Sequence, residues 1–414
     1  MKKNKSGFTL IELLAVIVIL AVILVIAIPR ILDVIETSKK DSFKNSAQLI
    51  ADSAEKKKAS DKLLDKDEEI TCKDVAKIND EDYASCTISF DESGVAKVSI
   101  VGRGKFDGLK ITNGTKENAE VKEITKPPYG MKATEYITNL LEYGGEGLKI
   151  DNTSDENIRY YGSDPNNYVS FNNELWRIIG VFGNNVKLIR SEKLGNLSWD
   201  SSEKSIDNGA GINQWGESTY EDGSTYEGSD LMLYLNDSKD YFLTIDETAK
   251  TLIDNYTWNT GGVEDATRTD TLAFYNAERG EKTGKICTSG TRCNDTVNRT
   301  TTWTGYVALP YITDWAYASS ESDCETNLDK QDSSTYICKN NNWMHRSDGT
   351  WYLSPYANSG GAHRVWVVRF DGGAGSPGAY NSYGVAPAIY LKSNILIESG
   401  KGTSSDPYIL KAGS

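Results

Sequence analysis

One apolar stretch near the N-terminus, Phe8 to Ile28, constrains most strongly how this chain can fold. Only Thr9 and Glu12 interrupt its apolar character. As a helix, a stretch of this length spans roughly 30 Å, the thickness of the hydrocarbon core of a bilayer. Three lysines precede it within residues 1–7, which is typical of the cytoplasmic flank of a membrane segment. The sequence therefore predicts a transmembrane helix over residues 8–28.

Glu12 separates three interpretations of this stretch. A secretory signal peptide has a shorter apolar core followed by a small residue, whereas here Gly7 precedes the apolar run. A plain membrane anchor accounts for the length but not for Glu12, because a carboxylate in the membrane is costly unless it has a partner or a function. The third interpretation gives Glu12 such a partner.

Residues 5–12, Lys-Ser-Gly-Phe-Thr-Leu-Ile-Glu, resemble the processing site of type IV pilins and pseudopilins. The resemblance implies a leader at residues 1–7, cleavage by prepilin peptidase after Gly7, and N-methylation of Phe8. It also implies that Glu12 pairs with the Phe8 ammonium group of a neighbouring pilin subunit during assembly. The chain would then be a single-pass membrane protein before assembly. Its C-terminal part would be extracellular, at the cell surface or in a pilus or pseudopilus.

The composition favours an exported protein. The formal net charge is −14, so nucleic acid is not expected as a partner. The six cysteines form three local couples, and an even number on the exported side predicts disulfides. A zinc site is disfavoured because no couple has a two-residue gap. The couples are Cys72 with Cys86, Cys287 with Cys293, and Cys324 with Cys338.

Hydrophobic periodicity divides the chain into five parts and predicts an α+β fold. After the leader, apolar residues at three- and four-residue spacing, which include Phe43, Ala47, Ile50 and Ala54, extend the pilin-like helix over residues 8–58. Alternation over residues 86–90 and 96–101 predicts a small antiparallel β domain over residues 59–112. Residues 113–159 are expected to be a linker with one short helix. Residues 160–414 are expected to form a larger, mixed, β-rich and surface-exposed C-terminal domain.

The C-terminal part carries a second resemblance. Residues 171–180, 351–355, 365–368 and 383–391 are similar to an uncharacterised domain of bacterial, mostly Gram-positive, surface proteins. In that domain the last string usually contains Gly-Val-Arg-Pro, whereas this chain has Ala386 in place of the arginine. The order of early helices and a late tryptophan-rich β region is similar to C-type-lectin-like folds. The resemblance thus implies a lectin-like C-terminal domain.

Catalysis is not expected, because two histidines leave little room for a histidine-based triad or acid–base pair. A binding surface is expected instead, because rigid aromatic side chains among short polar ones form recognition surfaces with little entropy to lose. Trp351 and Trp366, on strands, are assigned to the core. The candidate ligand face comprises Trp343, His345, Arg346, Tyr356, His363, Arg364, Tyr380 and Tyr383.

Calcium is the one cofactor that the sequence raises. Asp222, Glu227 and Asp230 lie in an acidic, glycine-containing segment, and carboxylate oxygens are ligands that Ca²⁺ prefers. Their spacing does not match an EF-hand loop. A solvated acidic loop is the favoured alternative, and no other cofactor is predicted.

These features together predict a minor or tip pilin-like subunit that displays a large adhesion domain for a host or environmental glycan or protein. The bulk of that domain would hinder a uniform filament, which disfavours a major pilin. A structural pseudopilin of a type II secretion or competence (DNA-uptake) machine is the first alternative. A cell-surface enzyme acting on glycans is the second.

The substitution Glu12→Ala tests the pilin interpretation. We expect it to abolish incorporation into filaments while leaving membrane insertion intact, because only the paired charge between subunits is lost. The measurement is the amount of subunit in sheared filaments relative to the amount in the membrane fraction. A plain membrane anchor would tolerate the substitution without any change in either fraction.

Overall fold

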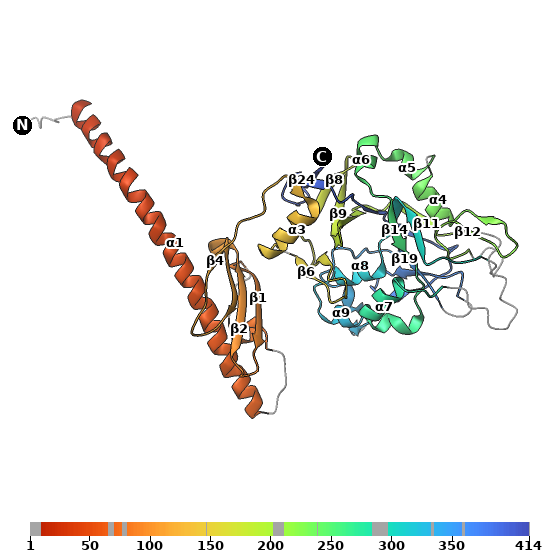
Figure 1. Cartoon of the computed structure of the whole chain (residues 1–414), viewed down its shortest axis with the longest axis horizontal. Helices are drawn as coiled ribbons and strands as arrows, with labels where there is room; N and C mark the ends of the chain where they lie inside the picture. Colours follow the sequence, from red (N-terminus) through yellow and green to blue (C-terminus); the bar gives the residue numbers. More distant parts are fainter. Residues whose placement is uncertain are drawn as a thin grey trace, which may run out of the picture. The chain divides into compact units, whose positions relative to one another are not determined.

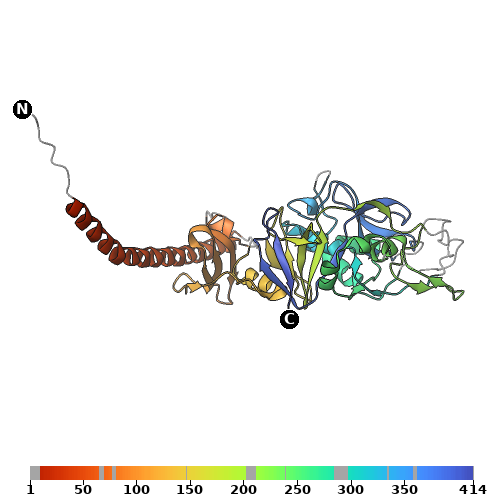
Figure 2. The same ribbon diagram turned by 90° about the horizontal axis from the view of Figure 1, so that it is seen from above.

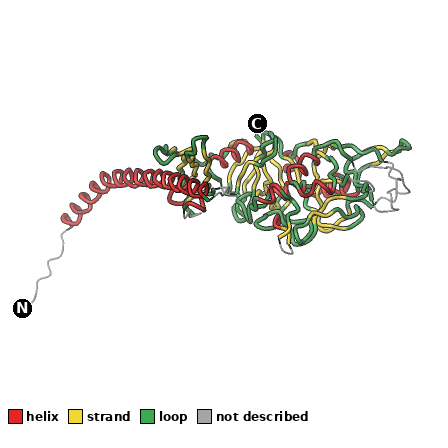
Figure 3. The backbone as a smooth tube through the Cα atoms, turned by 90° about the horizontal axis from the view of Figure 1, so that it is seen from below, coloured by secondary structure: helices red, strands yellow, loops and turns green. Residues whose placement is uncertain are grey.

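The chain forms two compact units, residues 1–126 and residues 127–414. A computed structural model describes residues 10–64, 70–76, 81–145, 147–201, 211–237, 239–283, 297–332, 335–357 and 361–413. The first unit contains a long helix, and the second is β-rich with mixed sheets, so the fold class is α+β as predicted. Figure 1 labels many of the elements, and Figure 3 distinguishes helices, strands and loops by colour.

The first unit is one long helix beside a four-stranded antiparallel sheet of order β1-β2-β3-β4. The alternating segments predicted over residues 86–90 and 96–101 lie within β1 and β2. The elements are α1 (Leu10–Leu63), α2 (Cys72–Val75), β1 (Tyr83–Phe90), β2 (Ala96–Gly102), η1 (Gly104–Phe106), β3 (Leu109–Gly114) and β4 (Lys122–Glu123).

The C-terminal half of α1 supplies one side of the core of this unit. Phe43, Ala47, Ile50 and Ala54 are buried, and their spacing places them on one helix face, as the sequence predicted. They belong to one apolar cluster with Val98 and other residues of the sheet. The sheet therefore holds the helix by its apolar face rather than by surface charges.

The N-terminal half of α1 has a different environment. Its described apolar side chains are exposed, including Leu10 at 84% and Ile35 at 57%. The helix continues through Pro29, and Figure 2 shows that its N-terminal part curves. Within the described part of the chain, no helix has the length and hydropathy that crossing a membrane requires. Gly7 and Phe8, the Glu12 side chain and part of the predicted 8–28 span lie outside the described residues.

Two of the three predicted disulfides are confirmed. Cys72 is bonded to Cys86 in the first unit, and Cys324 is bonded to Cys338 in the second. Each bond closes a chain segment with a sequence separation of 14 residues. The third couple, Cys287 and Cys293, lies outside the described residues.

The second unit is built on a 10-stranded mixed sheet with the order β16-β23-β10-β9-β8-β25-β24-β5, extended by β6 and β7 beside β9. Residues 127–159, within the expected linker, contribute β5, α3, β6 and β7 to this unit. The strands are β5 (Met131–Lys132), β6 (Leu148–Ile150), β7 (Ile158–Tyr160), β8 (Tyr168–Phe171), β9 (Glu174–Phe182), β10 (Asn185–Arg190), β16 (Val307–Ala308), β23 (Ala388–Tyr390), β24 (Ile395–Ser399) and β25 (Tyr408–Ala412).

A five-stranded sheet of order β11-β22-β19-β20-β21 lies in the same unit. The chain passes from the large sheet to this one between β10 and β11 and goes back to the large sheet at β16. It enters the five-stranded sheet again at β19 and makes its last return between β22 and β23. Trp351 and Trp366 are fully buried, as the core assignment predicted. The strands are β11 (Gly195–Ser198), β19 (Thr350–Pro355), β20 (Val365–Val368), β21 (Ala374–Gly375) and β22 (Ser382–Val385).

Short helices, hairpins and 3-10 turns complete the second unit. They are α3 (Ala133–Glu142), α4 (Asp230–Asn236), α5 (Tyr241–Thr244), α6 (Glu247–Leu252), α7 (Thr271–Glu278), α8 (Ile312–Tyr317), α9 (Asp323–Thr326), β12 (Ser218–Thr219), β13 (Thr225–Tyr226), β14 (Tyr256–Asn259), β15 (Thr302–Gly305), β17 (Gln331–Asp332), β18 (Thr335–Tyr336), η2 (Asp265–Thr269) and η3 (Ile337–Lys339).

Two local backbone features set the position of β9. Asn172 and Asn173 both have positive φ, which suits the tight two-residue turn between β8 and β9. Gly180 on β9 lies so close to β7 that a Cβ atom there would be 2.1 Å from the Ile158 carbonyl oxygen. Gly180 is paired with Arg159, so this close approach holds Arg159 next to β9.

Candidate ligand-binding pocket

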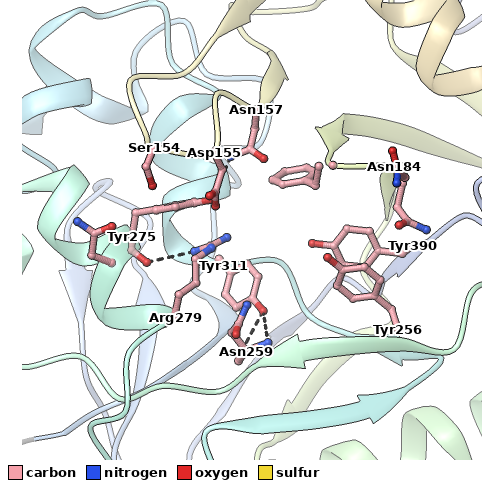
Figure 4. Close-up of a pocket in the computed structure, with 14 residues that line it drawn as sticks. Ser154, Asp155, Asn157, Asn184, Tyr256, Asn259, Tyr275, Arg279, Tyr311 and Tyr390 are labelled. Atoms are coloured by element: carbon pink, nitrogen blue, oxygen red, sulfur yellow. Dashed lines mark hydrogen bonds between the residues drawn. The ribbon is translucent and has the colours of Figure 1, made fainter.

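A cavity of about 750 Å³ opens in the second unit (Figure 4). Its size falls within the range of roughly 300–1,000 Å³ that is usual for small-molecule sites. The lining combines amides, phenols, one arginine and one carboxylate. It consists of Ser154, Asp155, Asn157, Phe182, Gly183, Asn184, Asn185, Tyr256, Asn259, Tyr275, Asn276, Arg279, Tyr311 and Tyr390.

Segments far apart in the sequence supply this lining. They include the turn between β9 and β10, strand β14, the end of α7, the residue before α8, and the end of β23. Asp270 begins α7 by accepting a hydrogen bond from the Ala273 amide at 2.9 Å. The helix ends at Glu278, and Arg279 follows as its cap. Glu278 is buried, whereas the Arg279 side chain lines the cavity.

Arg279 is held flat against Tyr275. Its guanidinium carbon lies 3.4 Å from the Tyr275 ring centroid and 4.9 Å from that of Tyr311. Its Nη1 donates to the Tyr275 carbonyl oxygen at 3.2 Å and lies 3.4 Å from a carboxylate oxygen of Glu278. The arginine is thus stacked and oriented before any ligand arrives.

Tyr275 is itself fixed by hydrogen bonds. Its hydroxyl donates to Asp155 Oδ2 at 2.6 Å and accepts from Asn157 Nδ2 at 3.0 Å. Burial raises the pKa of Tyr275 to about 12, so its hydroxyl remains a donor at neutral pH. The opposite side of the pocket in Figure 4 carries Tyr256 and Tyr390, whose ring centroids are 3.7 Å apart in a stacked arrangement.

A network of buried charges lies under the pocket. Asp314, on α8, accepts from Lys187 Nζ and from Arg159 Nη1, both at 2.5 Å. Its Oδ2 also accepts from the backbone amide of Tyr311 at 2.9 Å. Arg159 donates from Nε to Asp151 at 2.8 Å, and Asp151 accepts from Asn157 Nδ2 at 3.1 Å. The network thus contacts two pocket residues, Tyr311 and Asn157, directly.

Burial and ion pairing have opposite effects on the pKa values of the charged groups in this network. Burial lowers the pKa of Lys187 to about 8, although the charge of Asp314 opposes that change. Burial alone would raise the pKa of Asp314, but the charges of Lys187 and Arg159 outweigh it and the pKa remains lowered. The three side chains are therefore charged together near neutral pH, which satisfies charges that would be costly alone.

Glu278 joins the pocket to the second sheet. Its carboxylate accepts from the hydroxyls of Thr313 and Ser354, the latter at 2.8 Å. The side chain is fully buried, and burial raises its pKa to about 6 although Arg279 opposes the shift. Glu278 thus partly balances the charge of Arg279 from the interior.

The eight residues predicted to form a ligand face are spread over different environments, and none lines the pocket. Trp343 is half-buried, and its Nε1 donates to the Tyr160 carbonyl at 2.8 Å. Arg346 donates from Nη1 to the Ser191 carbonyl at 2.7 Å. His345 is half-buried, and burial lowers its pKa. Trp343 and Arg346 thus bind the backbone of their own unit.

The remaining members of the predicted face differ in their exposure. Tyr356 is buried, and the exposed Arg364 guanidinium lies 5.9 Å from its ring centroid. His363 and Tyr383 are half-buried, whereas Tyr380 is 53% exposed. The structure therefore leaves Arg364 and Tyr380 as the two exposed side chains of the predicted face.

The predicted calcium ligands are not brought together. Among the residues that the structure describes, no group of three or more His, Cys, Asp or Glu side chains could hold a metal ion. Asp222 accepts from the Ser224 amide at 2.8 Å, and Asp230 accepts from the Ser201 amide at 2.9 Å. Each of these two carboxylates thus accepts a hydrogen bond from a backbone amide, and Asp230 is the first residue of α4.

The sequence did contain a signal for the buried network. Lys187 and Arg159 lie on apolar strands, and Asp314 lies in the apolar helix Ile312–Tyr317. A charged residue within an apolar element is costly without a partner, so such residues are expected to meet one another. The pocket itself had no comparable signal, because its Asn and Tyr residues come from strands, a helix and turns that are far apart in the sequence.

Residues 2–28 match the family model described as the prokaryotic N-terminal methylation motif. The motif is consistent with a type IV pilin or pseudopilin and is typical of structural subunits. It implies processing by prepilin peptidase, assembly with other pilin subunits, and a membrane-anchored subunit that reaches the pilus surface. No curated protein and no solved structure matches the chain.

The substitution Asp314→Asn tests the buried network. We expect a loss of about 3–5 kcal/mol in the free energy of unfolding, because Lys187 and Arg159 would keep buried charges without their shared partner. Glu398→Gln is the control, since its ion pair with Lys411 is exposed and contributes at most about 1 kcal/mol. Urea unfolding of the full-length chain measures both. Equal losses in the two variants would contradict the assigned role of Asp314.

The raised pKa of Glu278 predicts that the stability of the folded chain depends on pH. The folded state holds its proton more tightly than the unfolded chain, so its contribution is complete below the ordinary pKa of 4.5. The contribution is lost as the pH rises through about 6, and it amounts to about 2 kcal/mol. Comparing Glu278→Gln with the native chain at pH 4.5 and 7 isolates it, because other groups contribute equally to both. Parallel pH profiles would contradict the prediction.

Proposed function

We propose that this chain is a minor pilin-like subunit at a filament tip and that its second unit captures an extracellular ligand in the pocket lined by Arg279. The observation that carries the proposal is the pocket itself. It is preformed, of ligand size, and lined by polar groups that converge around stacked aromatic rings.

The organisation of the chain supports this division of roles. The N-terminal methylation motif accounts for residues 2–28, and α1 leaves the apolar side chains of its N-terminal half exposed for other subunits or lipid. The second unit is larger than the first and contains a separate apolar core. A unit of this size beyond the assembling helix suits display at a tip better than repetition along a filament.

The interior of the second unit also supports a binding role. The charges under the pocket are paired, and its tyrosines are fixed by hydrogen bonds or ring stacking. Preorganised groups lose little freedom when a ligand binds, which favours affinity. A lectin-like fold for this unit stays a prediction from the resemblance.

The pocket has rim residues that can be altered without disturbing the core. Asn184 is exposed, lies in the turn between β9 and β10, and makes no side-chain hydrogen bond within the described part of the chain. Asn184→Trp would place a bulky ring at the pocket edge. Asn340 is also an exposed asparagine but does not line the pocket, so Asn340→Trp is the matched control.

A binding screen against glycans and host-matrix proteins tests the proposal, with the full-length chain in detergent micelles. We expect saturable binding that Asn184→Trp weakens at least about tenfold and Asn340→Trp leaves unchanged, because only the first blocks the pocket. Equal binding by both variants would contradict the assignment of the pocket. Absence of any binding would favour a structural pseudopilin of a secretion or DNA-uptake machine.

A further inference from the structure

The pocket contains a cation with unused donors. The hydrogen bond and the ion pair of Arg279 both involve Nη1. Its Nε and Nη2 donate to no group in the part of the chain that the structure describes, and the side chain is 18% exposed. A guanidinium carries five N–H donors in a fixed plane, so one edge of Arg279 remains available to a ligand.

The orientation of this guanidinium restricts what can bind to it. The Tyr275 ring covers one face at 3.4 Å, so a ligand can approach the free edge in the guanidinium plane. A planar carboxylate makes two parallel hydrogen bonds to such an edge, which is the strongest arrangement available to an arginine. Glu278 does not block this edge, because both its oxygens are engaged with Thr313 and Ser354 in the interior.

The rest of the lining suits hydroxyl groups and a ring. Ser154, Asn184 and Asn276 are exposed in the pocket, and within the described residues their side chains form no hydrogen bond. They can donate to and accept from ligand hydroxyls. Asp155 accepts from Tyr275 and, as a carboxylate, can accept further hydrogen bonds from a ligand hydroxyl. The aromatic rings offer apolar surface to the carbon skeleton of a sugar ring.

We propose that the pocket binds an acidic sugar, a hexuronic acid unit, with its carboxylate on the free edge of Arg279 and its hydroxyls on the amide and serine rim. This inference rests on the proposed function and specifies the chemistry of the ligand. A neutral sugar would leave the Arg279 edge without a partner, and a simple carboxylate would leave the rim without one.

Titration of the full-length chain in detergent micelles with D-galacturonic acid and D-galactose tests the inference. The two sugars share their ring and differ in the carboxylate at C6. We expect the acid to bind about 10- to 100-fold more tightly than the neutral sugar, because a charge-assisted hydrogen bond is lost with the carboxylate. Sodium acetate is the control for charge without a ring and is expected to bind more weakly than galacturonic acid.

Two variants locate the effect. Arg279→Lys keeps the charge but lacks the planar fork, and we expect it to remove most of the preference for the acid while thermal unfolding confirms that the variant is folded. Asn184→Trp should weaken both sugars together. Equal affinity for the two sugars, an unchanged preference in Arg279→Lys, or no binding of either sugar would overturn the acidic-sugar inference. Pocket-dependent binding of another ligand would then leave the proposed function standing, whereas binding insensitive to Asn184→Trp would overturn both.

Discussion

The contact of Asp314 with Lys187 and Arg159 is the interaction on which the second unit depends. All three side chains are buried, and they join helix α8 to strands β10 and β7. Because a buried charge without its partner costs several kcal/mol, these elements must dock in one relative arrangement. Asp314 also accepts a hydrogen bond from the Tyr311 amide. Arg159 donates a hydrogen bond to Asp151, and Asp151 accepts another from Asn157. The walls of the pocket are therefore set by electrostatics in the interior rather than by the loops alone.

The topology explains why a pocket forms at this place. The turn between β9 and β10 ends one hairpin of the large sheet, and β23 pairs with β10 beside it. Helix α7 contributes Tyr275 to the pocket, and Arg279 follows directly after that helix. Gly180 permits β7 to approach β9 closely enough to place Arg159 under the same region. The β9–β10 turn, strand β14 and the C-terminal end of α7 therefore carry most of the polar groups, and such supports favour a fixed rather than an adaptable binding geometry.

The sequence predicted local features well and the site poorly. Alternation over residues 86–90 and 96–101 predicted strands, and the register of Phe43, Ala47, Ile50 and Ala54 predicted the buried helix face, because both follow from the periodicity of one element. Tyr356 was assigned to a ligand face, yet the structure buries it. An aromatic residue beside Gly and Ser has the same local pattern in a core as on a surface. Tyr275, Tyr311 and Tyr390 meet only through long-range packing, which no short stretch of sequence encodes.

The two halves of α1 obtain their contacts from different sources. The half from Phe43 onward is covered by its own sheet, whereas the described apolar side chains from Leu10 to Ile35 have no cover within their unit. Moving the exposed half from lipid to a bundle of other helices would therefore exchange only external contacts. The folding free energy of the unit and the free energy of its transfer are thus separate quantities. Such a subunit can change its surroundings many times without unfolding once.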